Sequence, residues 1–148
     1  MIDSQTEVNE MRKIGLLCLI VCLLFLLPSC AGVARFAAVR IGESEKFTKD
    51  EIREAVRVVR ESAFDETFVV RIVYDEARSD ETIRSYMENG RGRTNGVREE
   101  NVIVLFTDFF TGGNTGALNP HDLYTGYGWT LIRDGKDGEW VLDDCGYG

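Results

Sequence analysis

A short apolar segment near the start of the chain most constrains what the rest can fold into. Residues 14–27 are almost all hydrophobic, follow Arg12 and Lys13, and lead to Cys30 within three residues. A basic segment, a short hydrophobic segment and small residues around a cysteine are typical of a bacterial lipoprotein export signal. We therefore expect residues 1–29 to be removed and only the remainder to form the folded protein.

The same segment could also be an uncleaved transmembrane anchor. Its apolar run is shorter than the roughly 20 residues that a spanning helix needs, and Pro28 ends it. We therefore expect a lipid on Cys30 to hold the protein in the cell membrane of a bacterium, on the extracytoplasmic face. The acidic residues among positions 1–10 do not suit an export signal, which leaves Met11 as an alternative start of translation.

The chain after the signal is long enough for one domain. Residues 30–148 amount to about 120 residues, the usual size of a single domain. Residues 30–45 show no strong period and are predicted to be a tether, and residues 46–148 are predicted to be the domain. The formal net charge of the full chain is −8, which argues against nucleic acid as a partner.

Cysteine and histidine are scarce after the signal. Once Cys30 is lipidated, Cys145 is the one cysteine left, so no internal disulfide is expected, and we predict that its thiol is buried. His121 is the single histidine, and its neighbours Asn119 and Pro120 indicate an exposed turn. We therefore expect neither a zinc site nor any other metal site, and the sequence suggests no cofactor.

Residues 49–62 carry the strongest helix signal. Thr48 and Glu51 have the spacing of a capping box, and Phe47 has the spacing to pack on Ile52 as a hydrophobic staple. One face of the helix is apolar, which predicts that it packs on a core. The residues of this face are Ile52, Val56, Val59 and Ala63.

The rest of the chain predicts a shorter helix and several strands. The helix is expected at 79–89, and the strands at 68–74, 101–110, 127–133 and 139–143. Because turns join the later strands, we predict an α+β fold in which the helices lie on one face of a curved antiparallel sheet of about four strands, with the first helix packed on it. This arrangement is similar to that of the cystatin and nuclear-transport-factor folds.

Several blocks of the sequence resemble an uncharacterised family of small lipoproteins and secreted domains from Gram-positive anaerobic bacteria. The likeness covers most of residues 47–147. The last block usually has tryptophan in this family where the present chain has Cys145. The resemblance implies an envelope location and a single α+β domain, and it implies no activity. The blocks that carry it are 86–92, 100–106, 118–120, 124–129 and 143–147.

Two segments are candidates for binding. Residues 112–128 combine glycine and asparagine with aromatic side chains, which suits a surface for an envelope protein, a peptide or a glycan. The same aromatics could instead fold back onto the core. The candidate residues here are Asn119, Tyr124, Tyr127 and Trp129. Arg91 and Arg93 lie beside glycines and could hold a phosphate or carboxylate, or could simply balance nearby acids.

An enzyme would need a carboxylate in a pocket, and acids follow several predicted strands. One hypothesis is a hydrolase or isomerase that uses Asp108 and Tyr127, and the further candidate acids are Asp75, Asp143 and Asp144. No catalytic set is evident from their spacing. The leading prediction is therefore a lipid-anchored extracytoplasmic binding protein, with a small envelope enzyme and an immunity or inhibitor protein as alternatives.

Overall fold

The computed structural model describes residues 37–147. The predicted export signal, Cys30 and the start of the predicted tether lie outside these residues. Within the described part, no helix is long and apolar enough to cross a membrane.

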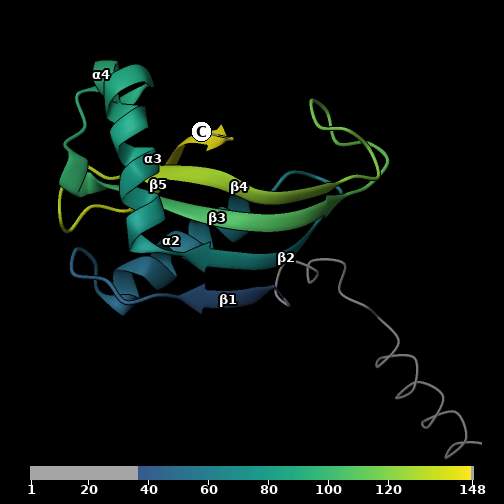
Figure 1. Ribbon diagram of the computed structural model, residues 1–148, viewed down its shortest axis with the longest axis horizontal. Helices are drawn as coiled ribbons and strands as arrows, with labels where there is room; N and C mark the ends of the chain where they lie inside the picture. The colour runs from purple at the N-terminus through teal and green to yellow at the C-terminus, as the bar shows by residue number, and fades with distance from the viewer. Residues whose placement is uncertain (1–36, 148) are drawn as a thin grey trace, which may run out of the picture. The chain divides into compact units, whose positions relative to one another are not determined.

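The described chain forms a five-stranded sheet whose strands lie in the order of the sequence (Figure 1). The α+β class is confirmed, but the sheet is mixed rather than antiparallel, since its first strand runs parallel to the second. That first strand lies within the segment predicted to be a tether. The strands are β1 (Ala38–Ile41), β2 (Thr67–Tyr74), β3 (Val102–Thr111), β4 (Leu123–Ile132) and β5 (Val141–Gly146).

Helix α2 (Lys49–Ser62) confirms the strongest helix prediction. Thr48 accepts a hydrogen bond from the Glu51 amide, and the Glu51 side chain accepts one from the Thr48 amide, which completes the capping box. Phe47 is buried in the same core cluster as Ile52, as expected of a hydrophobic staple. This helix connects β1 to β2, which allows the two strands to run parallel.

Helix α3 (Glu76–Asn89) begins three residues earlier than predicted. Asp75 is its N-cap, and its carboxylate accepts a hydrogen bond from the Arg78 amide at 2.9 Å. Ser79, which was predicted to start the helix, lies inside it and is buried. Its Oγ accepts a hydrogen bond from the backbone amide of Val104 in β3, which ties the helix to the sheet.

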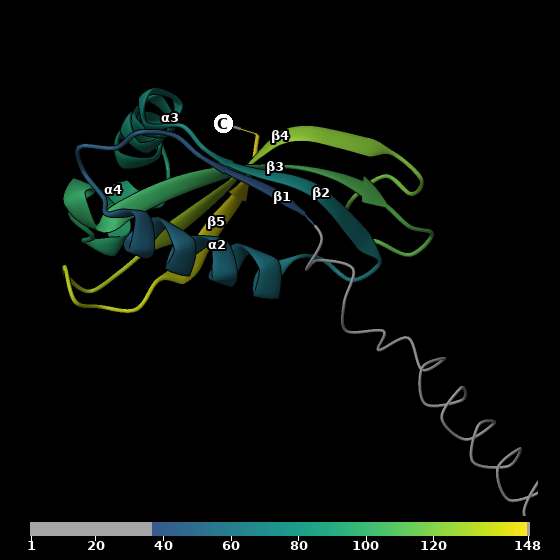
Figure 2. The same cartoon turned by 90° about the horizontal axis from the view of Figure 1, so that it is seen from below.

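The two long helices lie on opposite faces of the sheet, so the prediction of helices on one face is wrong (Figure 2). Ile103, Leu105 and Phe109 of β3 share a core with α2, while Val104 and Phe106 belong to the core on the α3 side. Strand β3 is therefore apolar on both sides. The smaller core on the α3 side consists of Ile83, Tyr86, Val102, Val104 and Phe106.

Short elements complete the domain. Helix α4 (Gly92–Asn95) and the 3-10 helix η2 (Glu99–Asn101) connect α3 to β3. Strands β4 and β5 form the predicted antiparallel hairpin, with Asp-Gly turn residues between them. Strand β4 begins at Leu123, four residues before the predicted start, which shortens the glycine-rich connection to residues 112–122.

Candidate functional site

The structure separates the residues predicted to form a binding loop. Trp129 and Tyr127 are only 1% and 7% exposed and belong to the core beside α2. The Trp129 indole donates a hydrogen bond to Thr107 Oγ1, and the Tyr127 hydroxyl donates to Cys145 Sγ at 3.8 Å. These aromatics therefore fold back onto the core, which the sequence had left open as the alternative to binding.

Asn119, in the connection between β3 and β4, and Tyr124, near the start of β4, do come together. The Asn119 amide donates a hydrogen bond to the Tyr124 hydroxyl at 2.8 Å, and the Tyr124 ring stacks on Phe109 at 5.2 Å between centroids. Thr111 Oγ1 also donates to the Asn119 carbonyl. Hydrogen bonds thus hold residues 112–122 against the sheet. The polar contacts of Asn119 and Tyr124 stabilise this connection.

Arg91 and Arg93 lie at α4, away from that connection (Figure 1). The Arg91 Nε lies 3.2 Å from Asp143 Oδ2, so this guanidinium already faces a carboxylate. Arg93 is exposed to solvent. The two arginines and the aromatic residues do not form one surface.

The acids proposed for an enzyme also have structural partners. Asp108 forms an ion pair with Arg71 and accepts a hydrogen bond from the Gly126 amide at 2.9 Å. Gly126 has a φ of 66° within an irregular stretch of β4, so the Asp108 carboxylate holds a backbone conformation that favours glycine. Asp75 caps α3.

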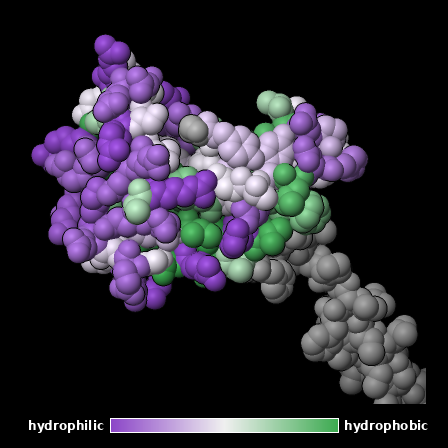
Figure 3. Space-filling view, in the orientation of Figure 1, coloured by the Kyte–Doolittle hydropathy of each residue, from purple (hydrophilic) through white to green (hydrophobic). Residues whose placement is uncertain are grey.

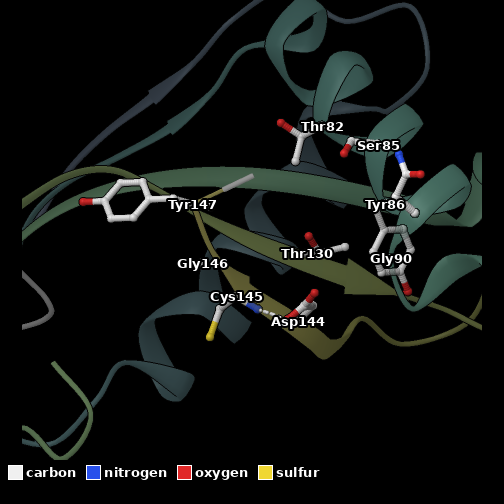
Figure 4. Close-up of a pocket in the computed structure, with 11 residues that line it drawn as sticks. Thr82, Ser85, Tyr86, Gly90, Thr130, Asp144, Cys145, Gly146 and Tyr147 are labelled. Atoms are coloured by element: carbon white, nitrogen blue, oxygen red, sulfur yellow. Dashed lines mark hydrogen bonds between the residues drawn. The ribbon is translucent and has the colours of Figure 1, made fainter.

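A pocket of about 370 Å³ lies between α3 and the β4–β5 end of the sheet (Figure 4). Helix α3 forms one wall through Thr82, Ser85 and Asn89, and the neighbouring strands form the other through Thr130 and Asp144. Thr130 and Asp144 are paired directly across β4 and β5, which places both side chains on the α3 face. From the sequence, Asp144 was predicted only as a strand-end acid, and Thr82, Ser85, Asn89 and Thr130 were not predicted as site residues.

Hydroxyls, an amide and one carboxylate determine what this pocket can bind. None of the described residues that line it is basic. Figure 4 shows the sulfur of Cys145 and the ring of Tyr147 directed away from Thr82 and Ser85, so neither side chain closes the pocket over them. The polar groups can exchange hydrogen bonds with ligand hydroxyls, and the Asp144 carboxylate can accept from a hydroxyl or an ammonium group.

A hydrogen-bonded cluster supports one end of the pocket. The Tyr86 hydroxyl donates to Asp143 Oδ2 at 2.7 Å and accepts from Asn95 Nδ2 at 2.6 Å. Burial, followed by the hydrogen bond to Asp143, raises the pKa of Tyr86 to about 12. Tyr86 therefore stays protonated at neutral pH and serves as a fixed donor. This cluster joins α3, α4 and β5 and fixes the separation of the pocket walls.

The sequence carried a weak signal for this pocket. Thr82, Ser85 and Asn89 are short polar residues on a helix whose other exposed positions include longer charged side chains. On β4, Gly128 and Thr130 alternate with the core residues Tyr127, Trp129 and Leu131, which places small residues beneath the helix. The two patterns meet only in three dimensions, so neither identifies a site alone.

Comparisons with known proteins add no function to this geometry. No family model, no curated protein and no solved structure matches the chain. Among the described residues, no group of three or more histidine, cysteine, aspartate or glutamate side chains is arranged to hold a metal ion.

Proposed function

We propose that the protein is a lipid-anchored binding module on the extracytoplasmic face of a bacterial membrane, with its ligand site between α3 and the β4–β5 strands. The lipoprotein signal that ends at Cys30 supports the location. The observation that carries the binding function is the polar pocket, in which five hydrogen-bonding side chains from two layers of the fold converge without a basic residue.

The chemistry of the pocket favours a polyhydroxylated ligand that is neutral or positively charged. Ser85 and Thr130 offer hydroxyls that both donate and accept, and Asn89 adds an amide. The Thr82 hydroxyl donates to the Arg78 carbonyl of its own helix and so offers a ligand an acceptor. Asp144 favours an ammonium group and repels an anion, because no basic lining residue compensates its charge. A sugar of the cell envelope has the required hydroxyls, and an amino sugar would add a favourable charge.

Three monosaccharides with the same pyranose ring separate the effect of ligand charge from that of ligand hydroxyl groups. Glucosamine is cationic, N-acetylglucosamine is neutral and glucuronate is anionic at neutral pH. We expect the purified lipoprotein in detergent to bind glucosamine best and glucuronate least, as measured by calorimetric titration. Binding of glucuronate in preference to the other two, or of none of the three, would contradict the proposal.

Asp144→Asn is the variant that tests the charge preference. The change keeps the side chain's size and removes its charge, so we expect the preference for glucosamine over N-acetylglucosamine to disappear. Asp65→Asn is the matched control, since Asp65 is exposed in the turn before β2 and does not line the pocket. If both variants change the preference equally, the effect comes from the net charge of the protein and not from the pocket.

A further inference from the structure

Three large apolar side chains form a continuous row across the open part of the sheet. Phe68, Phe110 and Leu123 are direct cross-strand partners on β2, β3 and β4, and they are 49%, 48% and 48% exposed. Direct partners in antiparallel strands place their side chains on the same face, within contact distance of one another. We call these three residues the apolar row.

The apolar row lies on the face that α3 covers only in part. Phe110 follows the buried Phe109, which faces α2, so its own side chain points to the α3 side. Helix α3 packs on Val102, Val104 and Phe106, at the other end of β3. Figure 3 shows apolar surface at the end of the sheet that the helix leaves uncovered. Val70, which is 48% exposed on β2, lies close to the row along the strand.

The chain enters the sheet at the same end as the apolar row. Strand β1 runs parallel to β2 with Ala38 opposite Arg71, so the chain before Ala38 joins from the side on which Phe68 lies. Six residues, 31–36, separate Cys30 from Ala37 in the sequence. Even fully extended, this segment reaches about 25 Å from Cys30. A lipid on Cys30 would therefore hold this end of the sheet close to the bilayer.

Charge indicates what kind of contact the row can make. Residues 61–70 and 105–132 contain no Lys or Arg, and Asp65, Glu66 and Asp122 are close to the row in sequence. The nearest arginine on β2, Arg71, forms an ion pair with Asp108, so its charge is already compensated. Attraction to anionic headgroups therefore contributes little, and the contact depends on burial of apolar side chains. The anchor keeps the effective concentration of the bilayer high, so weak apolar contact is sufficient. Two copies meeting through the row would bring these acids together, which disfavours a dimer.

We propose that the apolar row rests against the bilayer in which the protein is anchored and so fixes the orientation of the domain. This inference depends on the lipid anchor of the proposed function. Thr130 of the pocket lies seven residues beyond Leu123 along β4, or about 24 Å at the rise of an extended strand. The bilayer contact therefore lies near the opposite end of β4 from the pocket.

The test places a polarity-sensitive fluorophore beside the row while leaving the row intact. The lipidated full-length product, with Cys145→Ser, is labelled through Val70→Cys or, as a control, through Thr94→Cys on α4. The protein is reconstituted into vesicles of phosphatidylethanolamine and phosphatidylglycerol that contain a spin-labelled lipid quencher. We expect several-fold stronger quenching at position 70 than at position 94.

A second variant ties any quenching to the row. Phe68→Ser, Phe110→Ser and Leu123→Ser are combined in the chain labelled at position 70, and circular dichroism checks that it remains folded. We expect the quenching to fall to the level of the control position. Since all three side chains are half exposed, their replacement removes little of the core.

The outcomes separate the two proposals. A chain that carries no lipid and does not float with the vesicles contradicts the proposed function and this inference together. A chain that is lipidated and floats with the vesicles, but shows equal quenching at positions 70 and 94, overturns this inference alone. Quenching that persists in the triple variant also overturns it, as does crosslinking from position 70 to a second copy or to another protein in intact cells.

Discussion

The Arg133 guanidinium donates a hydrogen bond to Glu51 Oε1 at 2.7 Å and so joins the residue after β4 to the first turn of α2. Arg133 is buried, and its guanidinium lies 4.4 Å from the centre of the Trp140 ring. The Trp140 indole in turn donates to the Glu51 carbonyl. Glu51 thus has two structural roles, because it also completes the capping box with Thr48.

Glu51→Ala should therefore destabilise the domain more than the loss of an exposed acid. The change removes the capping interaction and leaves the buried Arg133 charge without its partner, at a cost of about 3 kcal/mol in the free energy of unfolding. Chemical denaturation of the variant measures this cost. Glu54→Ala on the exposed face of the same helix is the control and should change stability little. Equal effects would show that the buried ion pair contributes nothing.

The lowered pKa values of two glutamates predict that the stability of the domain falls in acid. Burial alone would raise the pKa of Glu51, but hydrogen bonds from the Thr48 amide and from Arg133 outweigh it and lower the pKa below the ordinary 4.5. The hydrogen bond from Ser44 contributes most to lowering the pKa of Glu76, and two backbone amides add to it.

Since both folded-state pKa values lie below the unfolded value, the stabilisation from these groups is complete above about pH 4.5 and is lost as the pH falls through the folded-state values. Denaturation curves recorded from neutral pH to about pH 3 should show this decline. Glu51→Gln combined with Glu76→Gln should make the decline shallower. A stability that rises as the pH falls below 4.5 would contradict the assignment.

The sequence predicted α2 well because its signals are local. Thr48, Glu51 and Phe47 act within one turn of one another, so their spacing alone specifies the start of the helix. The β4–β5 hairpin was also predicted correctly, since its turn residues lie between the two strands that they join.

The parallel strand and the placement of α3 depend on distant partners. Strand β1 has four residues and no strong alternation of apolar and polar side chains. Its parallel pairing with β2 depends on how α2, which connects the two strands, packs on the sheet. The continuous apolar run at residues 102–106 did carry information, because a strand without alternation is covered on both faces. This pattern would have placed helices on both sides of the sheet.

The candidate site was harder to predict than the fold. Tyr127 and Trp129 follow a glycine-rich segment and could have been exposed, and the irregular pairing near Gly126 determines which face each side chain takes. The pocket combines a helix face with a strand face from the other half of the domain. The spacing of residues along the chain does not predict that the helix face and the strand face meet, because the distance between them is set by the packing of Tyr86 and Ile83 on β3.

Ser79→Ala should destabilise the domain through the backbone of β3. The Val104 amide donates to Ser79 Oγ at 3.1 Å in a buried position, and the variant leaves that amide without this acceptor. We expect a loss of about 1–3 kcal/mol in the free energy of unfolding. Hydrogen exchange at Val104 should also become faster. Ser85→Ala on the exposed side of the same helix should leave stability nearly unchanged, and an equal loss there would indicate a general effect on helix α3.

Gly92→Ala tests the cluster that supports the pocket wall. An added Cβ at Gly92 would lie 2.5 Å from Tyr86 Cε1 and 2.7 Å from Met87 Sδ, so α4 must move away from α3. That movement weakens the contacts of Asn95 with Tyr86 and of Arg91 with Asp143, and overpacking of this kind costs about 1–3 kcal/mol. Thermal denaturation measures the loss.

Gly113→Ala is the matched control for this variant, because its nearest contact would be at an ordinary 3.7 Å. If the pocket is the ligand site, Gly92→Ala should also weaken sugar binding, since the wall formed by Tyr86 loses its support. Unchanged stability and unchanged binding would show that α4 is free to shift, and that the Tyr86–Asp143 contact does not fix the width of the pocket.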